Sequence, residues 1–147
     1  MEMKSSVADI LERELEPTIK EWLRRVNLVP ELTDIKLSDA DRTSHLPKLY
    51  YDLISRLRLS EDAKPAVSVT AAEHGRTRRA QGYTPTMLVD ESRVFQVVTF
   101  GALHIHQSEL DQNQVLSDAM VIADEVDAQL METVRSLMET KPAEAAA

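Results

Sequence analysis

The stretch His74–Glu91, HGRTRRAQGYTPTMLVDE, contains the end of one helix and the start of the next around a single corner. Gly82 stands where helices often end in a left-handed residue. Thr84 and Pro85 then supply an N-cap and the proline that is favoured at the first helical position. A connection this short predicts that the two helices run antiparallel.

The helix faces on both sides of this corner mix apolar and polar residues. Before the corner, residues spaced by four, three, four and three share one face and change from apolar to polar: Val67, Ala71, His74, Arg78 and Gln81. After it, Glu91 falls within an apolar face formed by Leu88, Phe95, Val98, Ala102 and Ile105. Because a buried carboxylate needs a partner and Arg78 lies within reach across the corner, we predict an Arg78–Glu91 pair.

The candidate site at this corner consists of five residues: His74, Arg78, Gln81, Tyr83 and Glu91. One interpretation is a structural polar network that locks the helix pair. The other is a ligand pocket. Both interpretations remain open together, because buried polar residues also line cavities.

Composition limits the class of protein. The chain has 147 residues, an apolar fraction of 43% and a formal net charge of -8, which predict one acidic globular domain. Such acidity argues against binding to nucleic acid or to an anionic membrane. The chain has no cysteine, begins without a signal-peptide core and has no apolar run long enough to span a bilayer, so a cytoplasmic location is expected.

The periodicity of apolar residues predicts an all-α bundle of about five helices with a long C-terminal helix. The expected helices cover residues 6–28, 38 to at least 57, 64–81, 85–107 and 110–138, with a loop at 27–37. Pro17 predicts a kink in the first helix, and Pro47 a break near the start of the second. A single domain over residues 1–139 is expected, followed by a flexible tail or linker at 140–147.

The last predicted helix has a heptad-like seam whose residues are three and four apart: Leu116, Ala119, Ala123, Val126, Leu130 and Leu137. Met120, Ile122, Met131 and Val134 add apolar surface beside it. A helix that is apolar on two sides can pack within its own domain and against a second copy, so a homodimer through this seam is expected. The alternatives are a core helix of a monomer and a dimer built on the first helix.

Known catalytic and metal-binding patterns are absent from the sequence. It has no Glu-x-x-His pair, no HExxH motif, no nucleophile motif and no phosphate-binding glycine loop. His104 and His106 are two apart on a helix and point in nearly opposite directions, so they cannot clamp one ion. We therefore expect no enzyme and no metal site. Haem stays open as a cofactor, through His74 or His45.

The sequence resembles the N-terminal domain of RsbR-type co-antagonist proteins in its RsbRD form, which also precedes bacterial sensor histidine kinases. The most specific matching string is His-Gly-x-x-Arg-x-x-Gln-Gly-Tyr at residues 74–83, and the other matches are Trp22-Leu23, Val26, Leu32-Thr33, LSDADR at 37–42, His45-Leu46-Pro47, Leu88-Val89 and Glu91. The resemblance covers about residues 7–138 and carries no established ligand. It implies an all-helical input domain of bacterial signalling, as in stress responses, usually placed before a kinase or STAS-type output domain. The chain is then either part of a longer protein or a free-standing copy.

Two functions are therefore expected as alternatives. The first is a non-catalytic sensor or regulatory domain that dimerises and passes a signal along its last helix to an output domain or partner protein. The second is a small-molecule or haem-binding domain with its pocket near His74 and Arg78.

Overall fold

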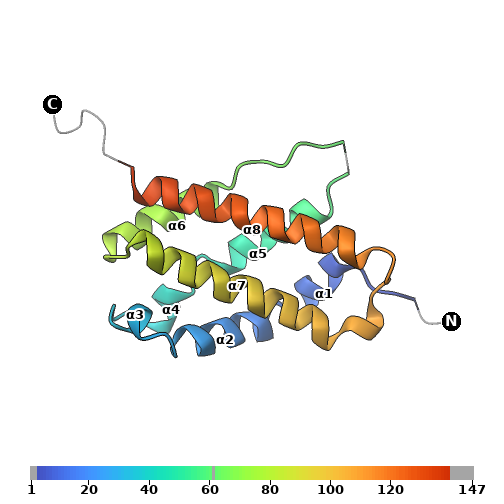
Figure 1. Ribbon diagram of the computed structural model, residues 1–147, viewed down its shortest axis with the longest axis horizontal. Coiled ribbons are helices and arrows are strands. Elements are labelled where there is room, and N and C mark those ends of the chain that lie inside the picture. Colours follow the sequence, from blue (N-terminus) through green and yellow to red (C-terminus); the bar gives the residue numbers. More distant parts are fainter. Residues whose placement is uncertain (1–2, 61, 140–147) are drawn as a thin grey trace.

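The computed structural model describes residues 3–60 and 62–139, and it confirms the all-α class (Figure 1). Extended pairing in this part of the chain is limited to one isolated bridge between Ser5 and Leu110. In chain order the helices are α1 (Val7–Arg13), α2 (Leu15–Val26), α3 (Pro30–Thr33), α4 (Asp39–Arg42), α5 (Leu46–Leu57), α6 (Val69–Ala80), α7 (Pro85–Ile105), the short 3-10 helix η1 (Gln107–Glu109) and α8 (Val115–Leu137).

The corner between α6 and α7 forms as predicted. Gly82 has a φ of 91°, and its N–H donates to the carbonyl of Arg79, while the N–H of Tyr83 donates to the carbonyl of Arg78. These two bonds are the Schellman pattern that ends a helix at a left-handed residue. Thr84 caps α7 and Pro85 is its first residue. The two helices leave the corner in opposite directions (Figure 1), and α8 packs on both of them.

Prolines break two of the predicted helices. The break near Pro47 was predicted, whereas the break before Pro17 was not. The predicted kink at Pro17 is instead a break at Glu14, which ends α1 and begins α2. Proline has no N–H for the carbonyl four residues back, and its ring crowds that carbonyl. For Pro17 that residue is Arg13, the last of α1. Pro47 acts in the same way, since α4 and α5 are separated by a turn that begins at Thr43.

Two other predicted helix starts were wrong. The helix expected from residue 64 begins at Val69, because the Ser68 hydroxyl accepts from the N–H of Ala71 and caps it there. Val67 therefore lies before α6, is exposed, and does not belong to the core face of that helix.

The last helix begins at Val115, after η1, and not at residue 110. The loop expected at 27–37 contains the single turn α3, while the predicted tail at 140–147 lies outside the described residues.

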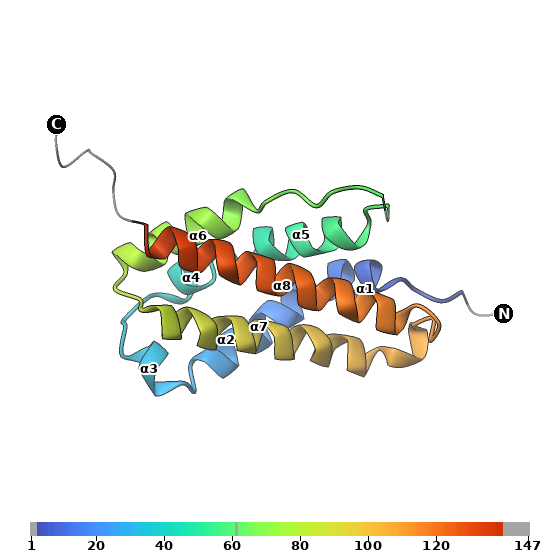
Figure 2. The same cartoon turned by 45° about the horizontal axis from the view of Figure 1, so that its top comes forward.

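The core lies where α8 packs against α5, α6 and α7, with α1 and α2 closing the other side (Figure 2). Its fully buried side chains include Trp22, Tyr50, Leu53 and Ile122. Tyr50 stacks on Phe95 at 4.3 Å and shares a 2.7 Å hydrogen bond with Thr99, so its hydroxyl is satisfied inside the bundle. No helix in the described part of the chain is both long and apolar enough to cross a membrane.

Candidate functional site

The predicted Arg78–Glu91 pair is present and buried. Arg78 is 0% exposed and Glu91 5% exposed. The guanidinium donates from Nε to Oε1 and from Nη2 to Oε2, both at 3.0 Å, so the pair is bidentate. Its Nη1 donates to the amide oxygen of Gln81 at 2.8 Å, which places this predicted residue in the network as well. A bidentate, fully bonded pair is the form in which two charges are tolerated inside a protein.

Tyr83 links this pair to a second buried arginine that the sequence did not predict as a site residue. The Tyr83 hydroxyl donates to Glu91 Oε2 at 2.8 Å and accepts from Arg42 Nη1 at 2.9 Å. Arg42 also donates to the carbonyls of Leu32 and Ile35, and its own carbonyl accepts from Arg78. The network therefore ties the α3–α4 segment to the α6–α7 corner. The signal in the sequence was the placement of Arg42 in the LSDADR string that carries the resemblance.

His74 lies beside the carboxylate of Glu91. Its Nε2 is 3.7 Å from Glu91 Oε1, and its Nδ1 is 3.1 Å from Nδ1 of His45, which directly precedes α5. Burial lowers the pKa of His74, with Arg78 adding to this effect and Glu91 opposing it. Burial also lowers the pKa of His45. Both imidazoles are therefore neutral near pH 7.

The charge on Glu91 is maintained by its partners. Burial alone raises the pKa of this carboxyl, but His74, Arg78 and Tyr83 outweigh burial and hold the pKa below its ordinary value. Burial and the neighbouring Glu91 charge raise the pKa of Tyr83, which therefore stays a hydrogen-bond donor. The arrangement is a buried ion pair with the Tyr83 hydroxyl and two neutral imidazoles beside it.

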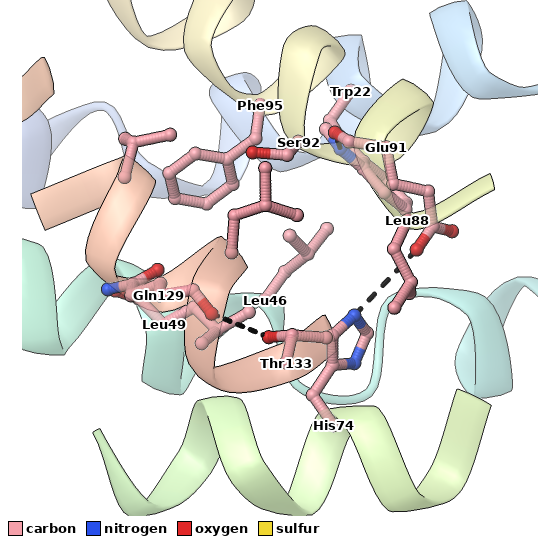
Figure 3. Close-up of a pocket in the computed structure, with 12 residues that line it drawn as sticks. Trp22, Leu46, Leu49, His74, Leu88, Glu91, Ser92, Phe95, Gln129 and Thr133 are labelled. Atoms are coloured by element: carbon pink, nitrogen blue, oxygen red, sulfur yellow. Dashed lines mark hydrogen bonds and ion pairs between the residues drawn. The ribbon is translucent and has the colours of Figure 1, made fainter. Parts of the chain in front are cut away.

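A cavity of about 50 Å³ adjoins this network, between α2, α5, α6, α7 and α8. Figure 3 shows the side chains around it, with His74 and Glu91 on one side and Phe95 and Gln129 on the other. Trp22, whose indole N–H donates to the carbonyl of Glu91, and Thr133 also line it. Its volume suits a few water-sized groups, and its wall combines polar and apolar side chains.

The predicted dimer seam on α8 is divided between the core and the surface. Val126 and Leu137 are buried within the subunit, and Ala119 and Leu130 are half-buried. Leu116, at 74% exposure, and Ala123 lie at the surface. The exposed apolar face is instead formed by Leu116, Met120, Ala123, Met131 and Met138, with Leu130 and Val134 at its edge. We call these seven residues the outer face of α8.

The remaining histidines stay apart from the site. His106 lies between Glu14 and Glu109, at 2.9 Å from each, and His104 is exposed. No cluster of three or more His, Asp or Glu side chains suited to a metal ion occurs in residues 3–60 and 62–139.

Comparisons with protein-family models, with curated proteins and with solved structures find no match to this chain. The resemblance to the RsbRD-type domain therefore stays a prediction from the residues quoted above.

Replacing Tyr83 with Phe is expected to lower the free energy of unfolding by about 1–3 kcal/mol, because Glu91 and Arg42 each lose a buried hydrogen-bond partner. Urea denaturation followed by circular dichroism measures the loss. Tyr51→Phe is the matched control, since Tyr51 is 52% exposed and a surface change costs less than about 0.5 kcal/mol. Equal losses in the two variants would show that the Tyr83 hydroxyl contributes nothing to the network.

Proposed function

We propose that this chain is a non-catalytic sensor or regulatory domain of a bacterial signalling protein, which dimerises and passes a signal through α8 to an output domain. The observation that carries the proposal is the close contact between α6, which holds His74 and Arg78, and α8. The resemblance to the RsbRD-type domain supports the same role.

Gly75 makes the contact between α6 and α8 unusually close. A side chain at this position would collide with the backbone carbonyl of Thr133 and with the Ser136 hydroxyl. Thr133 Oγ1 donates to the carbonyl of Ala71 at 3.1 Å, and Ser136 Oγ donates to that of Ala72. A shift of α6 at His74 would therefore move α8 with it, because packed helices respond as rigid elements.

The outer face of α8 supports dimerisation with a second copy. Leu116, Met120 and Met131 are exposed by 74%, 67% and 61%. They share a face at spacings of three and four with Ala123, interrupted by the single charge of Asp127. The same helix buries Ile122 and Val126 on its opposite side. A helix with one apolar face in its own core and another in solvent fits a partner helix of the same kind.

Ala123→Glu tests this dimer. Placing a carboxylate on the outer face is expected to convert a wild-type dimer into a monomer, as measured by size exclusion with light scattering, because an unpaired charge is costly inside an apolar interface. The helical signal should not change, since Ala123 is exposed.

Ala128→Glu is the control, because Ala128 is an exposed alanine of α8 outside the outer face. It should leave the dimer intact. The dimer contact would lie elsewhere, for example on the N-terminal helices, if Ala123→Glu remained dimeric. A wild-type monomer at high concentration would overturn the dimer itself.

Small-molecule binding is a second candidate function, favoured by the cavity beside His74 and Glu91. A thermal-shift screen tests it, because a ligand that prefers the folded state raises the melting temperature. Haem would require the helices to separate, since the cavity of about 50 Å³ is far smaller than a porphyrin. A visible absorption spectrum of the purified protein tests that form directly.

A further inference from the structure

Two histidines from different parts of the chain approach each other through their Nδ1 atoms. His45 stands directly before α5 and His74 lies in the middle of α6, yet their Nδ1 atoms are 3.1 Å apart. The rings meet edge to face, with centroids 5.1 Å apart. A neutral imidazole carries one N–H and one lone pair, so the proton positions decide what this pair can bind.

Glu91 favours one of the two proton positions on His74. Its carboxylate lies 3.7 Å from Nε2 of His74 and favours the N–H on that side. Nδ1 of His74 then carries the lone pair and directs it toward His45. Without a ligand, His45 donates its own Nδ1–H across the gap. With its proton on Nε2 instead, His45 would also carry a lone pair on Nδ1. Two lone pairs would then face the gap between the rings.

Charged groups of both signs surround this point. Burial lowers the pKa of both histidines, so their lone pairs are available near neutral pH. The positive charge of Arg78 is matched by Glu91 in the bidentate pair. On the α5 and α6 sides, Lys48 and Glu73 act on His45 with opposite signs.

We propose that His45 and His74 form a two-histidine site for a divalent transition-metal ion of the kind that imidazole prefers, Zn²⁺, Ni²⁺ or Cu²⁺. At metal–nitrogen distances of about 2.0–2.1 Å, nitrogens 3.1 Å apart subtend an angle of about 100°, which suits these ions. Glu91 is a positioning residue in this site. It lies at Nε2 of His74, the ring nitrogen that would not bind the ion, where carboxylates commonly orient metal-bound histidines.

The protein supplies only two ligands to this proposed site. No third His, Asp or Glu within residues 3–60 and 62–139 completes it, so water would occupy the other positions. Such a site exchanges its ion readily and suits detection better than permanent structural binding. The sequence predicted no metal, because His45 and His74 are 29 residues apart and the fold alone brings them together.

Isothermal titration of the tag-free protein with Ni²⁺ and Zn²⁺ tests the site. One ion per chain should bind, and His45→Gln should weaken the binding at least tenfold, while Mg²⁺ should not bind. His104→Gln is the control, since His104 is an exposed histidine outside the site, and it should bind as the wild type does.

Equal binding by His45→Gln and His104→Gln would overturn the proposal, and so would the absence of Ni²⁺ and Zn²⁺ binding at millimolar concentration. His45 is half-buried, so the variant is expected to fold, and circular dichroism checks this. As a second readout, Ni²⁺ should raise the melting temperature of the wild type but not that of His45→Gln. The site does not depend on the proposed dimer, because Ala123→Glu should bind the ion with unchanged affinity.

Discussion

Replacing Glu91 with Ala is expected to lower the free energy of unfolding by about 3–5 kcal/mol, the usual cost of removing one partner from a buried ion pair. Arg78, which is fully buried, would lose both of its bonds to the carboxylate, and Tyr83 would lose its acceptor. Chemical denaturation of the wild type and the variant measures the difference.

The control for this variant is Glu16→Ala. Glu16 pairs with Lys20 at the surface, where both side chains are more than two-thirds exposed, and such pairs contribute less than about 1 kcal/mol. Similar losses for Glu91→Ala and Glu16→Ala would mean that the Arg78–Glu91 pair is hydrated in solution. Glu91→Gln should fall between the two, since it keeps the shape of the side chain and removes its charge.

Replacing Gly75 with Ala is expected to lower the free energy of unfolding by about 2–3 kcal/mol. The usual effect of this change inside a helix is opposite in sign, a gain of roughly 0.5–1 kcal/mol. Here the added Cβ would collide with the carbonyl oxygen of Thr133 and approach its carbonyl carbon to 3.1 Å. Because a backbone group cannot rotate away as a side chain can, α6 and α8 would have to separate. Thermal unfolding followed by circular dichroism measures the change.

Gly101→Ala is the matched control. Gly101 lies inside α7, and a Cβ there meets no atom within 4 Å. This variant should gain roughly 0.5–1 kcal/mol, so the two glycine substitutions are expected to differ in sign. A gain in both variants would show that α6 and α8 adjust to the extra atom, and it would remove the main support for a rigid connection from His74 to α8.

The corner and its ion pair were predictable because their geometry is local. Gly82, Thr84 and Pro85 fix the backbone by their own steric and hydrogen-bonding preferences. Arg78 and Glu91 are then placed by the regular rise of two helices that start from one corner. Few other residues could alter that register.

The helix boundaries were less predictable because weak local preferences compete. The Ser68 cap stopped α6 short of the apolar pattern that begins at Val67. At Pro17 a kink was predicted, but the helix breaks one turn earlier, beside Arg13, because the carbonyl of Arg13 loses its donor. Looking four positions before Pro17 would have placed that break.

Contacts between distant segments were decided by tertiary structure. The sequence by itself determined the all-α class, the corner at Gly82 and the Arg78–Glu91 pair, because each depends on neighbouring residues. The contact of His45 with His74 and the side of α8 that faces solvent depend on how α5, α6 and α8 pack. The contact of Arg42 with Tyr83 depends on how α4 packs on the α6–α7 corner. The apolar arc of α8 is wide enough for several orientations, and only the shape of the surrounding helices selects which part of it is buried.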